Sequence, residues 1–155
     1  MSKNLYIFDL DDTLYKLNNK NGPVFAINKT LLNSLNGSKI LFSNASHNHC
    51  INWLDNLNIR EEFQAIFSNS NLHGYKPNPF MYKKIEQICG LKNYNNIYFF
   101  DDMPINLYPA KQLGWNTFLI GSLTHQNFFT TVNNTENYID HQFPTINDAL
   151  EYLLK

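Results

Sequence analysis

Three short apolar stretches of this sequence are each followed at once by side chains that could bind a metal ion or a phosphate. If the stretches are neighbouring parallel strands, their carboxyl ends meet at one edge of a sheet, where doubly wound folds bind ligands. One acidic residue at a strand end is common as a helix cap, so the coincidence of three indicates a site. The polar residues are Asp9, Asp11, Asp12 and Thr13 after Leu5–Phe8, Ser43 and Asn44 after Lys39–Phe42, and Asp101 and Asp102 after Ile97–Phe100.

The acidic residues of this set suggest a magnesium site. Carboxylates crowded at one edge repel one another unless a cation lies among them. Oxygen ligands suit Mg²⁺, and no His or Cys stands inside these motifs to favour zinc. The two-residue spacing of Asp9 and Asp11 places both on one side of an extended segment. One of the two could therefore attack a substrate while the other handles a proton.

Lys76 could supply the positive charge that a phosphoryl group needs during transfer. It stands in the sequence Lys76-Pro77-Asn78-Pro79, after the third predicted strand. Proline restricts the residue before it to extended conformations, which fixes the backbone that carries the lysine. Alone, Lys76 would be taken for a solvated loop residue, but beside the acidic motifs it becomes a candidate catalytic and phosphate-binding residue.

The elements that position these residues predict an α/β fold in a single domain of residues 1–155. Short apolar runs alternate with helical patterns, which is typical of βαβ units in a three-layer α/β/α, Rossmann-like arrangement with a mainly parallel sheet. We expect five strands, at Leu5–Phe8, Lys39–Phe42, Phe63–Phe67, Ile97–Phe100 and Thr117–Ile120.

Helices are expected between and after these strands. In the third of them, Phe80, Ile85 and Ile88 are expected to face the core, and Ser122–His141 is expected to form a long loop with at most one short turn. The predicted helices span Val24–Leu35, His47–Leu57, Pro79–Gly90, Pro104–Leu113 and Ile146–Leu154.

Composition narrows the class of protein. The chain has 155 residues, 43% of them hydrophobic, and a net charge of −1, which gives no broad surface for nucleic acid. Its two cysteines, Cys50 and Cys89, do not form a metal or disulfide pattern. Since the sequence shows no signal peptide and no stretch long enough to span a membrane, we expect a soluble cytoplasmic protein.

Taken in order, these motifs resemble the haloacid dehalogenase (HAD)-like hydrolase superfamily over residues 4 to 121. The resemblance rests on Asp9-Leu10-Asp11-Asp12-Thr13, Ser43-Asn44, Lys76 and Asp101-Asp102. It is closest to the pyrimidine 5′-nucleotidase-like branch, through Leu41–Ala45 and the nearby His49. We expect His49 only to pack or to cap the second helix.

The resemblance implies a role for each motif residue. Asp9 would attack phosphorus and form an aspartyl-phosphate, and Asp11 would act as general acid and base. Asp12 would be a turn or capping residue. Mg²⁺ would be held by Asp9, the backbone carbonyl of Asp11 and Asp102, with Asp101 ligating or orienting through water. The phosphate would be bound by Lys76, by Ser43 and by the backbone amides around Leu10, Asp11 and Asn44.

Members of that branch usually carry a cap domain between the first two motifs, which this sequence lacks. Only about thirty residues separate Thr13 from Ser43, and residues 16–37 suffice for a flap and one helix. An open site would suit a bulky substrate, such as a phosphoprotein or a nucleic-acid end, or a second subunit that covers it in a homo-oligomer. Tyr15 and Phe25 of the flap could stack on a base, although core packing is the simpler interpretation.

The leading interpretation is therefore a Mg²⁺-dependent phosphomonoester hydrolase for a small-molecule phosphate ester, with a nucleoside monophosphate as one candidate. Dehalogenation is disfavoured because Asp11 is present, and phosphomutase activity is disfavoured because no cap fits. A non-catalytic binding module with the same fold is the alternative of another class, although Asp9, Asp11, Lys76 and Asp102 are all retained.

Overall fold

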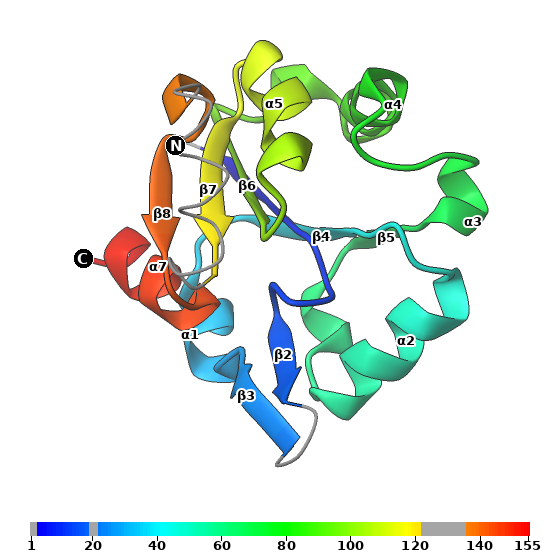
Figure 1. The fold of residues 1–155 in the computed structure, drawn as a ribbon. Coiled ribbons are helices and arrows are strands. Elements are labelled where there is room, and N and C mark those ends of the chain that lie inside the picture. The colour runs from blue at the N-terminus through cyan, green and yellow to red at the C-terminus, as the bar shows by residue number, and fades with distance from the viewer. Residues whose placement is uncertain (1–2, 19–21, 122–135) are drawn as a thin grey trace.

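The computed structural model describes residues 3–18, 22–121 and 136–155, and shows a mainly parallel six-stranded sheet flanked by helices (Figure 1). The strand order is β5-β4-β1-β6-β7-β8, and every neighbouring pair in this sheet is parallel. The predicted α/β/α, Rossmann-like class is thus confirmed. The strands are β1 (Asn4–Phe8), β4 (Ser38–Phe42), β5 (Ala65–Phe67), β6 (Asn96–Asp101), β7 (Asn116–Ile120) and β8 (His141–Phe143).

Helices cover both faces of the sheet. In Figure 1, α4 and α5 lie on one side, and α1, α2 and α7 lie on the other. Short 3₁₀ turns at residues 60–62, 91–93 and 136–138 complete the described part of the chain. The helices are α1 (Lys29–Ser34), α2 (His47–Asn56), α3 (Asn69–Leu72), α4 (Pro79–Cys89), α5 (Pro104–Gln112) and α7 (Ile146–Leu153).

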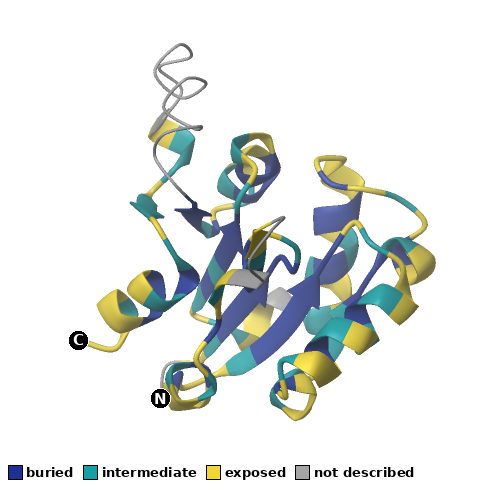
Figure 2. Ribbon diagram, turned by 60° about the horizontal axis from the view of Figure 1, so that its bottom comes forward, coloured by how far each residue is buried: buried dark blue, intermediate teal, exposed yellow. Residues whose placement is uncertain are grey.

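Two hydrophobic cores arise from the alternation of side chains along the central strands. In β1, Leu5 and Ile7 face the core beneath α4 and α5, whereas Tyr6 and Phe8 face the core beneath α1, α2 and α7. All four side chains are buried, and Figure 2 shows the central strands as a continuous buried layer. Each such apolar side chain contributes roughly 1.5–3 kcal/mol by leaving water, so the carboxyl edge of the sheet rests on a rigid base.

The strand order brings the candidate motifs together at one point. β1 lies between β4 and β6, with Phe8 in register with Leu41 on one side and Phe100 on the other. The residue after Phe8 is Asp9, which therefore comes level with the ends of both neighbouring strands. The chain leaves β1 toward β4 and later returns to β6, so this is the switch point where open α/β sheets bind ligands.

The predicted five-stranded sheet was one strand too small. The sixth, β8, pairs with β7 at the sheet edge and is only three residues long. A strand of His, Gln and Phe has neither an apolar run nor a clear alternation, so periodicity could not reveal it. The predicted loop at Ser122–His141 falls largely on residues outside the described ranges, and its end forms the 3₁₀ turn at 136–138 and the start of β8. The third strand begins at Ala65 and not at the predicted Phe63, because Phe63 is the C-cap of the 3₁₀ turn at residues 60–62.

Two helix predictions also need correction. The expected helix at Val24–Leu35 is divided into a strand, β3, and the short helix α1, which begins after its N-cap Asn28. In α4 the predicted inward stripe is wrong at two of its three positions. Phe80 and Ile88 are each 67% exposed, whereas Ile85 is buried beside Met81 and Tyr82.

The described residues between Thr13 and β4 form a hairpin and one helix. β2 (Tyr15–Asn18) and β3 (Gly22–Ala26) pair in antiparallel fashion, and α1 follows. Tyr15 is buried and stacks on Trp53 of α2, with ring centroids 3.7 Å apart. Phe25 packs against the core. Both flap aromatics are thus engaged with protein.

No helix among residues 3–18, 22–121 and 136–155 has the length and apolar character needed to cross a membrane.

Candidate active site

Asp9 lies at the centre of the site, immediately after β1. Its backbone N–H donates to the carbonyl of Phe100 at 2.9 Å, which continues the sheet by one residue and fixes the direction of the side chain. Oδ1 of its carboxylate accepts from Lys76 Nζ at 2.9 Å, and Oδ2 accepts from Thr13 Oγ1 at 2.8 Å. The residue is only 7% exposed. Asp9 is therefore a nearly buried carboxylate in one fixed orientation.

Lys76 uses its ammonium group to join three strand ends. Nζ donates to Asp9 Oδ1, to the carbonyl of Phe42 at 2.8 Å and to Asp101 Oδ2 at 2.7 Å. Burial lowers the pKa of Lys76, but the carboxylates of Asp101 and Asp9 outweigh it, so the net shift of the pKa is upward. Lys76 thus stays charged although its side chain is buried.

Asn44 holds the backbone that presents Lys76. Its Oδ1 accepts from the Lys76 backbone N–H at 2.7 Å, and its Nδ2 donates to the Lys76 carbonyl at 3.2 Å. The side-chain amide of Asn44 therefore joins the loop that follows β4 to the loop between α3 and α4. Its predicted contribution to phosphate binding would come from its backbone N–H and stays a prediction.

Asp101 and Asp102 come at the end of β6 and differ in their surroundings. Asp101 is fully buried; its Oδ1 accepts from the backbone N–H of Met103 at 2.9 Å, and both its oxygens lie 3.3 Å from Asn106 Nδ2. Burial, followed by the charge of Asp9, raises the pKa of Asp102 to about 9. Such a shift shows that the ionised form of Asp102 is disfavoured there without a further positive charge.

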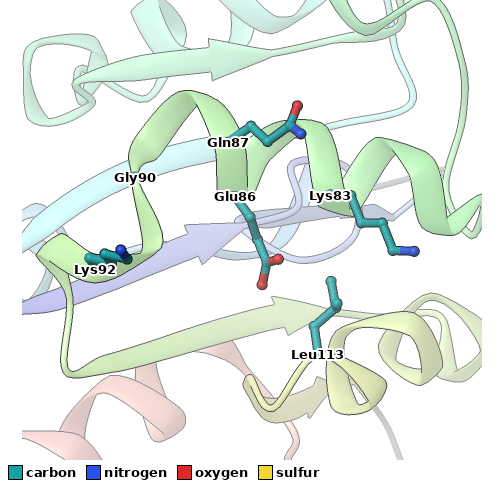
Figure 3. Close-up of a pocket in the computed structure, with 6 residues that line it drawn as sticks. All are labelled: Lys83, Glu86, Gln87, Gly90, Lys92 and Leu113. Atoms are coloured by element: carbon teal, nitrogen blue, oxygen red, sulfur yellow. The ribbon is translucent and has the colours of Figure 1, made fainter.

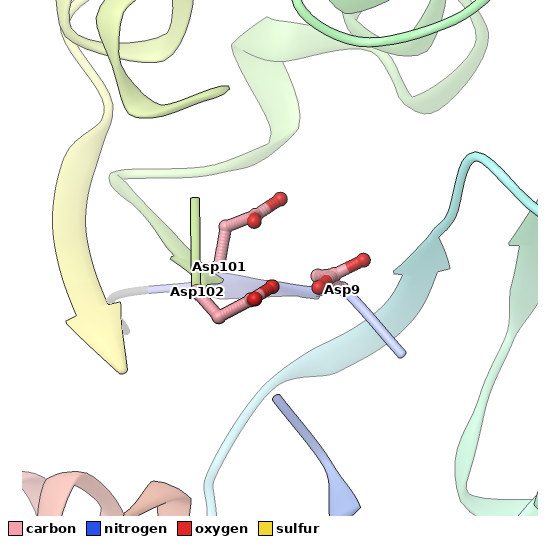
Figure 4. Close-up of side chains that lie close together, drawn as sticks. All are labelled: Asp9, Asp101 and Asp102. Carbon is pink, nitrogen blue, oxygen red and sulfur yellow. The ribbon is translucent and has the colours of Figure 1, made fainter. Parts of the chain in front are cut away.

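A divalent cation fits this group of residues. One carboxylate oxygen from each of Asp9, Asp101 and Asp102 lies within 4.8 Å of the others (Figure 4). The ammonium of Lys76 bonds to two of these carboxylates, those of Asp9 and Asp101. An all-oxygen set of this kind suits Mg²⁺, and a bound cation would reverse the upward pKa shift of Asp102.

Asp11 lies in a separate, half-exposed environment. Its Oδ1 is 2.8 Å from His49 Nε2 and also accepts from the hydroxyl of Tyr15. Burial first, and then the contact with Asp11, raise the pKa of Tyr15, which keeps its hydroxyl protonated. The expectation that His49 only packs or caps α2 was wrong, because its imidazole contacts the candidate general acid and base. The next residue, Asp12, has a φ of 64° and is the expected turn residue.

Ser43 and Leu10 are buried residues that lie just after β4 and β1, next to the site. Ser43 is 2% exposed, and its Oγ accepts from the backbone N–H of Ala45 at 3.0 Å. The side chain of Leu10 is fully buried in the core. Leu10 could therefore contact a phosphate only through its backbone, and the phosphate-binding roles of both residues stay predictions.

The structure thus gathers Asp9, Lys76, Asp101 and Asp102, and leaves the Asp11 carboxylate in a neighbouring group. Sequence reasoning missed the side-chain contacts of Thr13, Tyr15, His49 and Asn106. Thr13 belongs to the quoted first motif, so its hydroxyl could have been foreseen. Asn106 lies in the first turn of α5, close in sequence to Asp101, and this short separation is a signal that could have been used.

A separate pocket of about 470 Å³ lies along α4, away from these residues (Figure 3). Within it, Glu86 is engaged by Trp115 Nε1 at 2.8 Å. None of its lining residues follows a strand at the carboxyl edge of the sheet. They are Lys83, Glu86, Gln87, Gly90, Lys92 and Leu113.

Comparison with known proteins agrees with this architecture. A family model described as haloacid dehalogenase-like hydrolase matches residues 28–120, more than half of the chain. The chain belongs to this family. The match includes Ser43, Lys76 and the pair Asp101 and Asp102, but it begins after Asp9 and Asp11, whose assignment rests on the geometry. Comparison with curated proteins finds no match to this HAD-like hydrolase.

Solved structures share the fold. L-2-haloacid dehalogenase from Xanthobacter autotrophicus, with chloropropionic acid covalently bound, has a TM-score of 0.63 and 17% identity over 81% of this chain and 58% of that one. The cobalt-bound deoxy-D-mannose-octulosonate 8-phosphate phosphatase from Haemophilus influenzae has a TM-score of 0.57 and 13% identity. That comparison covers 97% of this chain and 88% of the phosphatase. This HAD-like hydrolase thus spans about 58% of the length of the dehalogenase. At these identities the likeness shows the fold alone, and the reaction must be argued from the side chains.

Proposed function

We propose that this HAD-like hydrolase is a Mg²⁺-dependent phosphomonoester hydrolase that works through an aspartyl-phosphate on Asp9. One observation carries the proposal: the Asp9 carboxylate is held by Lys76 and Thr13 directly beside Asp101 and Asp102. A nucleophile, a fixed ammonium and a carboxylate set for a divalent cation are what phosphoryl transfer requires at one point.

Asp9 is the proposed nucleophile because its environment orients it. With the carboxylate held by one donor on each oxygen, little conformational freedom remains to be lost when a substrate binds. Lys76 places a positive charge against Oδ1 and would face the phosphoryl oxygens as their charge redistributes. Bond formation between Asp9 and phosphorus splits the hydrolysis into two easier steps.

Asp11 is the proposed general acid and base. It would give a proton to the leaving oxygen in the first step and take one from the attacking water in the second. Its half-exposed side chain, in contrast to that of Asp9, can exchange a proton with a substrate or with water.

Asp9, Asp102 and the backbone carbonyl of Asp11 would hold Mg²⁺, with Asp101 beside it as a ligand or as an orienting group. When bound, the ion would neutralise negative charge on the phosphate and on the three carboxylates. The side chains themselves support this assignment, because an anionic phosphate would otherwise approach a group with excess negative charge.

Two other functions are weaker. One structural neighbour is a dehalogenase, but dehalogenation needs neither the second aspartate of the first motif, Asp11, nor a carboxylate set for a metal. A non-catalytic binding module would have little use for Asp11 with its own donors His49 and Tyr15.

The segment in the place of a cap domain bears on the class of substrate that can reach the site. Between Thr13 and the start of β4, the described residues form only the β2–β3 hairpin and α1, which is a minimal cap. A 5′-nucleotide is one candidate from the resemblance to the nucleotidase-like branch. The minimal cap favours a second candidate substrate, a phosphoprotein or a nucleic-acid end, which an open site could admit. Alternatively, a second subunit of a homo-oligomer could cover the site. A cytoplasmic location is part of this proposal.

A phosphate-release screen tests the proposal. Purified protein would be assayed with an aryl phosphate, nucleoside monophosphates, sugar phosphates and phosphopeptides, with Mg²⁺ and with EDTA. We expect Mg²⁺-dependent release of phosphate and none from the Asp9→Asn variant. Binding of Mg²⁺ without turnover of any substrate would favour the binding module.

A further inference from the structure

Two donors from different elements converge on one oxygen of Asp11. His49 Nε2, from α2, lies 2.8 Å from Oδ1, and the hydroxyl of Tyr15, from β2, donates to the same atom. With its ring proton on Nε2, His49 donates to Oδ1 as the Tyr15 hydroxyl does. Oδ1 of Asp11 therefore accepts both hydrogen bonds, while Oδ2 of the same carboxylate takes part in neither.

Both donors are held firmly. His49 stands in the first turn of α2, where its backbone N–H donates to Oγ of the N-cap Ser46 at 3.3 Å. Tyr15 is 5% exposed and stacks on Trp53 at an interplanar angle of 14°. Because Trp53 also belongs to α2, the helix supports both hydrogen bonds to Asp11.

We propose that His49 is a positioning residue, which with Tyr15 anchors Oδ1 of Asp11 and thereby assigns proton transfer to Oδ2. This inference rests on the proposed function, because it takes Asp11 as the acid. As Asp9 forms its bond to phosphorus, the bond from phosphorus to the leaving oxygen breaks, and that oxygen takes the proton from Oδ2. The attacking water later returns a proton to Oδ2 while its oxygen bonds to phosphorus and releases Asp9.

Loss of His49 should slow the hydrolysis of some substrates more than that of others. An aryl leaving group departs with little help from an acid, whereas an alkyl leaving group needs the proton. The parameter to compare is kcat/KM, because it reports the first, phosphoryl-transferring step and is insensitive to a slow second step. A misplaced Asp11 therefore lowers kcat/KM for an alkyl phosphate more than for an aryl phosphate.

The test uses three variants of the full chain with p-nitrophenyl phosphate and glycerol phosphate. His49→Ala removes the donor, and His49→Gln replaces it with an amide N–H. His47→Ala is the matched control, because His47 is exposed in the same turn of α2 but cannot face the same way two residues apart. We expect the kcat/KM of His49→Ala to fall about tenfold more with glycerol phosphate than with the aryl ester. This loss is smaller than the roughly 10²–10⁴-fold expected when the general acid itself is removed. We expect His49→Gln to regain part of this loss and His47→Ala to match the wild type.

A double variant shows whether His49 acts through Asp11. In an Asp11→Asn background, the further change His49→Ala should have no leaving-group-dependent effect. Equal losses with both substrates in His49→Ala, or an undiminished effect in the Asp11→Asn background, would overturn the positioning role. Absence of phosphate release by the wild type would instead refute the proposed function itself, so the two failures are distinguishable.

Discussion

Asp9 and Asp11 are two residues apart in the chain, yet they lie in opposite kinds of environment. Asp9 is nearly buried, with an ammonium on one oxygen and a hydroxyl on the other. The Asp11 side chain is 43% exposed and meets an equally exposed His49 and the hydroxyl of Tyr15. The first environment suits a group that must stay ionised and fixed, and the second suits a group that must change its protonation state. Environment thus separates two identical side chains into two proposed roles.

The comparison has a structural cause. Asp9 extends β1 by one hydrogen bond and belongs to the sheet, where its neighbours are strand ends. Asp11 has already left the sheet and meets α2 and the hairpin instead. Substitutions that affect the sheet-bound group should therefore change both stability and activity, whereas those at the second group should change activity alone.

The largest expected effect is that of Asp9→Asn on turnover. The neutral amide is a poor nucleophile, so kcat should fall by about 10⁴-fold or more. Far-ultraviolet circular dichroism should be unchanged, because the change is nearly isosteric. Activity within tenfold of the wild type in a phosphate-release assay would remove Asp9 from its role.

Asp11→Asn comes next and should separate activity from stability. We expect a loss of about 10²–10⁴-fold in kcat/KM with an alkyl phosphate, because the leaving group then departs without its acid. The free energy of unfolding should change by less than about 1 kcal/mol, since the pair with His49 is half-exposed. A large stability loss in urea unfolding would contradict the contrast between the two aspartates.

Lys76→Met should be the most destabilising change at the site. It leaves the buried carboxylates of Asp9 and Asp101 without their ammonium, at a cost of about 3–5 kcal/mol in unfolding free energy. The matched control is Lys39→Met, a second buried lysine of the sheet, whose partner Glu62 lies 3.7 Å away. In urea unfolding, added Mg²⁺ should raise the unfolding free energy of Lys76→Met by more than that of Lys39→Met, which keeps the ammonium beside Asp9. An equal gain in both variants would count against a cation site beside Asp9.

A smaller effect is expected from Mg²⁺ on the wild type. Binding to the folded state alone stabilises by about 2.7 kcal/mol at a hundredfold excess over Kd. Thermal unfolding with increasing Mg²⁺ should show a rising Tm, and Asp102→Asn should reduce this response. Asp140→Asn, which alters an acid that pairs with Lys111 and contacts Thr117 near the start of β7, should keep this response. A Tm that is insensitive to Mg²⁺ would remove the metal from the site.

Much of the site could be predicted because it follows from strand ends. Asp9, Lys76 and the pair Asp101 and Asp102 come directly after or between buried runs, and parallel pairing brings such positions together. The contacts of His49 could not be predicted, because they depend on how α2 packs against the hairpin. The buried face of α4 was also predicted wrongly, because Phe80 and Ile88 are as apolar as the residues that the sheet covers. Those residues, Met81, Tyr82 and Ile85, lie on the side that packs against the sheet.

The short elements at the periphery escaped prediction for a related reason. β8 gains its strand conformation from pairing with β7, and its own three residues have little preference for it. In the same way, β3 is a strand because β2 lies beside it, although its residues continue an apolar pattern into α1. Tertiary pairing overrides local pattern at both places.

The account is tested most directly by trapping the covalent intermediate. Asp11→Asn, which lacks the base for the second step, would be mixed with an aryl phosphate and Mg²⁺, quenched in acid and digested for mass spectrometry. We predict the added mass of one phosphoryl group on the peptide that contains Asp9, and its absence in the double variant with Asp9→Asn. Steady turnover by the wild type with no phosphorylated Asp9 peptide in the quenched variant would contradict the account.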